Sequence, residues 1–175
     1  MSLWWVFAFY GIERTLELWL AARNRRLLLA RGGREYFPET YRTLVLLHSL
    51  FFAALLAESA PWQVPLDALT GVCLAGLAKL MALRWWCIAT LGVHWNTRIL
   101  VLPGAPAVRR GPYRFLRHPN YLVVTLEFAL IPLLCRAPLT LVVFSLANLV
   151  VLRRRIALEE QALREVTDYG KRFGG

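Results

Sequence analysis

The stretch LDALTGVCLAGLAKLMALRWWCIATL, residues 66–91, indicates how the whole chain folds. Between Asp67 and Arg84 its only charged residue is Lys79, and Leu and Ala make up most of the rest. A helix needs about 20 consecutive, mainly apolar residues to cross the hydrocarbon core of a bilayer. The stretch therefore predicts a membrane-spanning α-helix.

The composition favours a membrane protein over a soluble one. Of the 175 residues, 58% are hydrophobic, and a soluble domain of this size has too much surface to hide so many apolar side chains. The net charge is +10, which on a soluble fold would suggest a nucleic-acid-binding surface. Here the cations fall between the apolar runs, where membrane proteins place them. We therefore expect membrane lipids, and no nucleic acid, as partners.

Four further apolar segments accompany residues 66–91. They are residues 3–22, 44–60, 121–134 and 138–152. The last two are short and only Cys135-Arg136-Ala137 separates them, so they predict a helical hairpin, tilted or set in a thinned part of the bilayer.

Residues 156–171 are polar and amphipathic, and we expect them to extend the fifth helix as an arm outside the membrane. The chain is thus predicted to be an all-α integral membrane protein. It would have about five transmembrane helices in a single domain, residues 1–175.

The distribution of Arg predicts the orientation. Residues 23–42 carry six Arg against two Glu, a net charge of +4, and residues 94–118 carry five more Arg. Arg153 to Arg155 follow the fifth apolar segment. Loops rich in Lys and Arg stay in the cytoplasm, so we expect the N-terminus outside and the C-terminus in the cytoplasm, in a bacterial plasma membrane.

Several charged residues fall inside the apolar segments. Glu13 and Glu17 share one helical face, and a structural interpretation is an ion pair of either one with Lys79 that holds the bundle together. Glu127 lies within residues 121–134. It is a candidate for orienting a substrate hydroxyl, and the alternative is an ion pair with Arg84.

The densest group of polar side chains is Gly111 to Tyr121, where a loop enters the fourth apolar segment. Pro119 suits the first turn of a helix, and the free N–H groups there, beside Arg117 and His118, attract anions. Tyr113 and Tyr121 add flat aromatic faces that suit a purine or a cation. An interfacial anchor, with Arg at the headgroups, is the alternative interpretation.

A second group is Arg155 and Glu159, which are four residues apart and therefore share a helical face. One interpretation is an exposed ion pair of small energetic consequence. In the other, the arm folds over the loop, Glu159 holds an ammonium group and Arg155 faces an anionic substrate atom.

Together these motifs resemble the isoprenylcysteine carboxyl methyltransferase family. The motifs are Leu91-Gly92-x-x-Trp95, Gly111-Pro112-Tyr113, Arg117-His118-Pro119-Asn120-Tyr121 and Arg155-x-x-x-Glu159-Glu160-x-x-Leu163. They cover residues 91–165, and Glu13-Arg14-x-x-Glu17-Leu18 with Arg23-Asn24 extends the likeness to a bacterial branch.

The resemblance implies S-adenosylmethionine as the cofactor, bound between the loop, the start of the fourth helix and the arm. It implies that the cofactor-binding residues are Tyr113, His118, Pro119, Asn120, Tyr121 and Glu159, with Ala107 and Val108 lying along the cofactor. Arg155 would face the substrate, with Glu127 or His118 assisting a less acidic hydroxyl.

The substrate expectation follows from the same resemblance. The chain ends at Asp168-Tyr169-Gly170-Lys171-Arg172-Phe173-Gly174-Gly175, without the family's longer tail, so we expect a lipophilic small molecule instead of a prenylated peptide. The bacterial branch is associated with O-methylation of alkylpyrone-like polyketides, and a carboxylate acceptor is also considered. The competing hypotheses are a phospholipid N-methyltransferase, an NADPH-dependent sterol-type reductase and a non-catalytic membrane scaffold.

Overall fold

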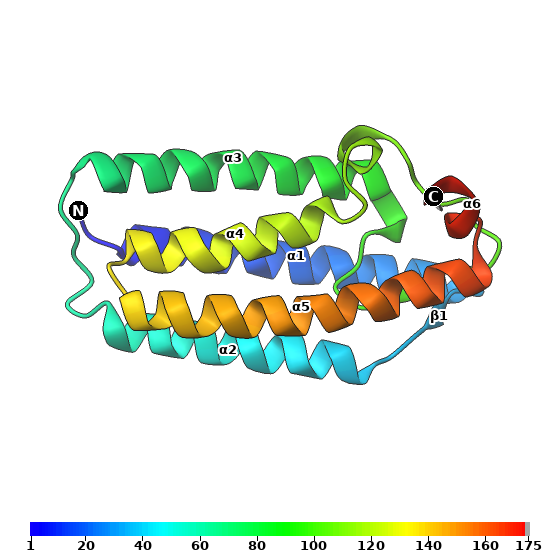
Figure 1. Ribbon diagram of the computed structural model, residues 1–175, viewed down its shortest axis with the longest axis horizontal. Helices are drawn as coiled ribbons and strands as arrows, with labels where there is room; N and C mark the ends of the chain where they lie inside the picture. Colours follow the sequence, from blue (N-terminus) through cyan, green and yellow to red (C-terminus); the bar gives the residue numbers. More distant parts are fainter. Residues whose placement is uncertain (174–175) are drawn as a thin grey trace.

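The computed structural model describes residues 1–173 and is mostly helical. Five long helices lie alongside one another in a bundle (Figure 1). They are α1 (Trp4–Ala30), α2 (Glu39–Glu58), α3 (Ala68–Leu91), α4 (Pro119–Leu134) and α5 (Pro138–Val166). The shorter elements are η1 (Gly92–His94), η2 (Gly111–Arg114), α6 (Tyr169–Phe173) and the strands β1 (Arg34–Glu35) and β2 (Leu100–Val101).

The two ends of the bundle differ in charge. The N-terminus and the α2–α3 and α4–α5 connections lie at one end, whereas the α1–α2 and α3–α4 connections and α6 lie at the other (Figure 1). Both Arg-rich segments, 23–42 and 94–118, and the C-terminal arm thus belong to this second end, which we call the basic end. The arrangement agrees with the orientation expected from the sequence, which stays a prediction.

The outer surfaces of the helices are apolar, and their inner stripes carry polar groups. The buried residues of α1 are spaced as one helical stripe that includes Glu13, Glu17 and Asn24, whereas Ile12 and Trp19 on its outside are 64% exposed. The same inversion holds for α5, where Asn148 and Arg155 are buried. Large exposed apolar surfaces need a covering, and lipid provides it.

Two helical stretches are long and apolar enough to cross a membrane, Glu39–Glu58 and Ala68–His94, and α4 is a shorter apolar helix. The expectation of a mostly helical membrane protein is confirmed, while the count of five spans stays a prediction. The first helix continues to Ala30 instead of ending at residue 22, because Asn24 and Leu28 prolong its inward stripe. The fifth helix and its arm form one helix to Val166, as expected.

A small sheet ties two distant segments together at the basic end; the sequence predicts a short extended piece at residues 97–102, which contains β2, but not its partner β1. β1 and β2 are antiparallel, with Arg34 opposite Val101 and Glu35 opposite Leu100. Glu35 accepts hydrogen bonds from Arg98 at 2.6 Å and from Arg25 at 3.2 Å. These contacts outweigh partial burial and lower the pKa of Glu35, so it stays ionised.

A buried group of charges joins α1, α3 and α4. Arg84 is 2% exposed, and its guanidinium donates to Glu17 at 3.0 Å and also to Glu127. Arg14 donates to the same two carboxylates, at 2.8 Å and 3.0 Å. Glu13 completes the group at 3.7 Å from Arg14. Burial of such charges in an apolar bundle is costly unless they are paired, so this group fixes how the three helices pack.

These contacts correct one expectation and select one alternative. Lys79 does not pair with Glu13 or Glu17, because it lies on the exposed side of α3 and forms no ion pair within residues 1–173. The cation that pairs with the buried carboxylates is instead Arg84, which is on the inward face of α3. The ion pair between Arg84 and Glu127, which was the alternative to a substrate-orienting Glu127, is present.

The orientation can be tested by labelling single cysteines. In a background with Cys73, Cys87 and Cys135 replaced by Ala, we expect Arg31→Cys at the basic end and Gln63→Cys at the other end to react from opposite sides of the membrane. A thiol reagent that cannot cross the membrane should label only the Gln63→Cys protein in intact cells. Equal labelling of both would contradict the predicted orientation.

The buried charge group predicts a large effect of a single substitution. Arg84→Met leaves Glu17 and Glu127 without their buried partner, and we expect the free energy of unfolding to fall by about 3–5 kcal/mol. Adding Glu17→Gln and Glu127→Gln should recover part of this loss. Lys79→Met, which removes an exposed cation from the same helix, is the matched control and should change stability by less than about 0.5 kcal/mol. Denaturant unfolding in detergent micelles measures both; equal effects of Arg84→Met and Lys79→Met would contradict the assignment.

Candidate active site

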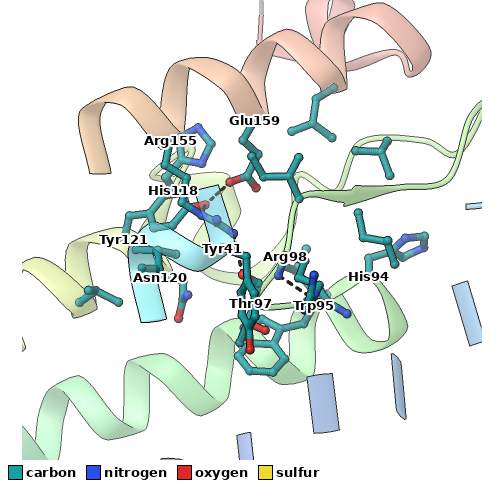
Figure 2. Close-up of a pocket in the computed structure, with 18 of the residues that line it drawn as sticks. Tyr41, His94, Trp95, Thr97, Arg98, His118, Asn120, Tyr121, Arg155 and Glu159 are labelled. Carbon is teal, nitrogen blue, oxygen red and sulfur yellow. Dashed lines mark hydrogen bonds between the residues drawn. The ribbon is translucent and has the colours of Figure 1, made fainter. Parts of the chain in front are cut away.

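A cavity of about 450 Å³ opens at the basic end and continues into the bundle. Its outer part is formed by residues 94–108, the start of α4 and the arm of α5. Its inner part lies between α1, α2 and α4, where Leu18, Leu44, Val45, Phe52 and Val124 line it. Figure 2 shows the outer part, where side chains from four segments far apart in the sequence point toward one another.

The segment that forms one wall is held by α1. Asn24 donates to the carbonyl oxygens of Trp95 at 2.8 Å and of Gly92 at 3.1 Å, and Asn96 donates to the carbonyl of Ala21 at 3.0 Å. The backbone N–H of Tyr36 donates to Ile99 at 2.9 Å. The C-terminal half of α1 and the residue that follows β1 therefore position this wall.

Gly111 allows the following loop to approach α3. Its φ is +54°, which favours glycine, and a Cβ there would lie 2.5 Å from Thr90 Oγ1. This close approach brings Tyr113 of η2 onto the cavity wall, where it is buried. Burial above all raises the pKa of Tyr113, so its hydroxyl is neutral and able to donate a hydrogen bond.

Tyr121 links the two residues that were singled out on the arm. Arg155 Nε donates to the Tyr121 hydroxyl at 2.9 Å, and that hydroxyl donates to Glu159. The other donors of Arg155 reach Thr40 Oγ1 at 3.1 Å and the carbonyl of Thr97 at 2.7 Å. Figure 2 shows Arg155, Tyr121 and Glu159 on one side of the cavity. Arg155 is 3% exposed, and the exposed Arg155–Glu159 ion pair considered above does not exist; Tyr121 connects the two instead.

The C-terminal segment closes over the outer part of the cavity. The Asp168 carboxylate accepts from the backbone N–H of Ala107 at 2.6 Å, and the N–H of Gly104 donates to Val166 at 2.8 Å. The hydrogen bond from Ala107, followed by that from Arg172, lowers the pKa of Asp168. Tyr169 and Phe173 of α6 both line the cavity, so the arm does fold back over the loop.

His118 and Tyr169 share one carboxylate. Their Nε2 and hydroxyl each lie 3.1 Å from Glu160 Oε1. Although partial burial acts in the opposite direction, these hydrogen bonds lower the pKa of Glu160. The ionised Glu160 thus orients the His118 ring, which lines the cavity beside Tyr121 with ring centroids 5.5 Å apart.

Two residues that line the outer part of the cavity each have a buried polar atom without a partner within residues 1–173. These atoms are Asn120 Oδ1, an acceptor, and Trp95 Nε1, a donor. Buried polar groups are nearly always hydrogen-bonded, so both point to a ligand. A ligand that joins an amino-substituted purine to an amino acid fits this set. Glu159 offers a carboxylate for the ammonium group of the amino acid, and Tyr121 and His118 offer aromatic faces for the purine.

Most of the residues implied by the resemblance lie together. Those that line the cavity are Ala107, Val108, Tyr113, His118, Asn120, Tyr121, Arg155 and Glu159. Pro119 is buried at the start of α4 and does not line it. Glu127 also lies off the cavity wall, in the buried charge group behind Arg14 and Arg84. Its role toward a substrate stays a prediction.

Sequence reasoning missed several cavity residues. Tyr41, Asn96, Thr97, Arg98 and Tyr169 line the cavity, and Arg98 lies over the Tyr41 ring at 3.9 Å. Trp95 was noted as part of a motif but not assigned to the site. A tryptophan next to two polar residues, at the point where an apolar stretch ends, was the available signal.

Comparison with known proteins agrees with this site. The model of the isoprenylcysteine carboxyl methyltransferase (ICMT) family matches residues 72–165, which include α4, the arm and the loop between α3 and α4. The uncharacterized protein YpbQ of Bacillus subtilis is 37% identical over 169 residues, which cover 93% of this chain and 96% of that one.

An uncharacterized protein of Haemophilus influenzae is 27% identical over 151 residues, which cover 86% of this chain and 88% of that one. No solved structure matches the chain. The family match spans more than half of the chain and contains most of the residues that build the outer cavity. The chain therefore belongs to the isoprenylcysteine carboxyl methyltransferase family and is a membrane-associated methyltransferase.

Proposed function

We propose that the protein transfers the methyl group of S-adenosylmethionine to an oxygen atom of a lipophilic acceptor, an alkylpyrone-like enol or a carboxylate. One observation carries this proposal: a single cavity is polar at the basic end and apolar between α1 and α2. The apolar part meets the outer surface at Leu18 and Val45, which are 52% and 47% exposed. A hydrophilic donor and a lipid-borne acceptor can therefore meet inside it from different sides.

The polar part supplies the groups that the methyl donor needs. Glu159 would accept from the ammonium group, Asn120 Oδ1 and Trp95 Nε1 would pair with polar atoms of the adenosine, and Ala107 and Val108 would lie along it. When bound, the cofactor supplies a methyl group activated by a positively charged sulfur. Asp168 and Tyr169 hold the C-terminal segment over this part.

The transfer itself needs positioning and charge more than a strong base. The acceptor oxygen attacks the methyl carbon as the carbon–sulfur bond breaks, giving the methylated product and S-adenosylhomocysteine. An acidic enol or a carboxylic acid has already lost its proton near neutral pH, and a preorganised cation nearby stabilises the resulting oxyanion. Arg155 is that cation, because Tyr121, Thr40 and Thr97 hold its guanidinium in one place at the cavity wall.

We propose further that the acceptor comes from the bilayer and the donor from the cytoplasm. The cavity's polar mouth is at the basic end, which the distribution of Arg assigns to the cytoplasm. We propose accordingly that the protein works at the cytoplasmic face of a bacterial plasma membrane. The apolar branch between α1 and α2 would receive the acceptor's chain from the lipid.

Substitutions of Glu159 and of Arg155 should affect different steps, cofactor binding and methyl transfer respectively. Glu159→Gln removes a charge-assisted hydrogen bond to the ammonium group, a loss of about 1.5–3 kcal/mol, so cofactor affinity should fall roughly ten- to a hundredfold. Arg155→Lys keeps a positive charge but loses the fixed fork of N–H groups, so single-turnover methylation should slow while cofactor affinity changes little.

The matched control for this pair is Glu165→Gln, which neutralises an exposed carboxylate on the same helix. Titration with S-adenosylmethionine and single-turnover methylation on all three variants provide the readout. Small and equal effects of Glu159→Gln and Glu165→Gln on affinity would show that Glu159 is a surface group and not part of the site.

The identity of the acceptor is tested by competition between substrate classes. With radiolabelled S-adenosylmethionine, we expect the purified protein to methylate a 4-hydroxy-6-alkyl-2-pyrone and not a farnesylcysteine analogue, as the likeness to the bacterial branch of the family implies. Binding of NADPH in place of S-adenosylmethionine would instead support a reductase. Methylation of the farnesylcysteine analogue alone would reverse the choice of acceptor.

A further inference from the structure

Several polar residues line the inner, mainly apolar part of the cavity, and the proposed transfer uses none of them; they are Arg14, Glu17, His48, Ser49 and Arg84. Arg14 projects from α1 and His48 from α2, and both line the cavity together with Leu44, Val45 and Phe52. His48 lies in the middle of Glu39–Glu58, one of the two stretches suited to crossing a membrane. Polar groups at that depth are rare and have a function by default.

The hydrogen bonding of His48 leaves one ring nitrogen for a ligand. Nδ1 lies 2.8 Å from the carbonyl oxygen of Leu44, and because a carbonyl only accepts, this nitrogen carries the hydrogen. In the neutral ring the lone pair is then on Nε2, which has no partner within residues 1–173. The ring also packs edge-on against Phe128, with centroids 5.0 Å apart, so its direction is fixed.

Arg14 offers the complementary donor. Its Nη1 donates to Glu17 at 2.8 Å and its Nη2 to Glu127 at 3.0 Å, so the guanidinium is held in place by the buried charge group. A guanidinium has five N–H groups, and the side chain is 23% exposed. The cavity wall therefore presents a fixed acceptor, His48 Nε2, and the remaining N–H groups of Arg14. The two residues contact neighbouring positions of α4, since Arg14 donates to Glu127 and the His48 ring packs against Phe128.

We propose that this inner site binds a second hydrogen-bonding group, a hydroxyl on the acceptor's chain. Such a hydroxyl donates to His48 Nε2 and accepts from Arg14, which satisfies both residues at a depth where water is scarce. A plain alkyl chain would leave both without partners, and unsatisfied polar groups weaken binding. The inference rests on the proposed function and defines its substrate class as chain-hydroxylated lipids.

The position of the hydroxyl follows from the spacing along α2. Thr40, which holds Arg155 at the transfer site, and His48 are eight residues apart on the same helix. At about 1.5 Å per residue this separation is about 12 Å along the helix axis. The chain hydroxyl should therefore lie about 12 Å from the oxygen that receives the methyl group, about two helical turns deeper in the bundle.

The test uses 4-hydroxy-6-alkyl-2-pyrones of equal chain length, with either a plain chain or one hydroxyl placed at successive positions. The full chain in lipid nanodiscs should show a roughly three- to tenfold lower KM for the probe with the hydroxyl at one mid-chain position, at similar kcat. His48→Leu should abolish this preference. His48→Gln should retain it, since its amide oxygen can replace Nε2 as the acceptor.

The control is Thr43→Val, which removes a hydroxyl from the exposed face of α2 and should leave the preference unchanged. The inference is overturned if no hydroxyl position lowers KM, or if the preference survives His48→Leu. If neither probe is methylated, the result contradicts the proposed function and not this inference. Equilibrium binding of the same probes then tests whether the inner site recognises the chain hydroxyl. Tighter binding of the hydroxylated probe by the natural chain but not by His48→Leu supports the inference, and equal binding overturns it.

Discussion

Arg84 lies almost fully buried in an apolar bundle, and its two bonds to Glu17 and Glu127 determine how three helices meet. A buried cation without a partner is strongly destabilising. The helices α1, α3 and α4 therefore cannot slide or rotate against one another without a large loss of stability. Arg14 extends the group to the cavity wall. The same charges therefore hold the bundle together and give the inner cavity its polar patch.

The cavity depends on how the segment between α3 and α4 is anchored to its neighbours. Asn24, Asn96 and the β1–β2 pair attach that segment to the end of α1, and Gly111 lets the rest of it approach α3. The arm of α5 then closes the opposite side through Tyr121 and Asp168. Hydrogen bonds to α1, to α4 and to the loop around Ala107 thus hold the walls of the polar part of the cavity in place.

The chemistry of the cavity changes along its length in a way that suits two different reactants. Its outer part has an amide oxygen, Asn120 Oδ1, and an indole N–H, Trp95 Nε1, without partners in residues 1–173, and it also holds the Glu159 carboxylate. Its inner part is lined by Leu, Val and Phe side chains, interrupted by Arg14 and His48. Arg155 lies where the two parts join, which explains why one buried cation is tied to α2, α4 and the loop at once.

The sequence by itself determined the helical membrane character and the grouping of Tyr113, His118, Asn120, Tyr121, Arg155 and Glu159, because hydrophobic runs and local motifs are legible along a chain. It could not show that Arg84, and not Lys79, faces the carboxylates, since both lie within one apolar stretch and the difference is the face of the helix that packing turns inward. Nor could it show that Tyr121 joins Arg155 to Glu159, or that His48 shares a cavity with Arg14. Those pairs come from elements far apart in the chain, and only tertiary packing brings them within hydrogen-bonding distance or into one space.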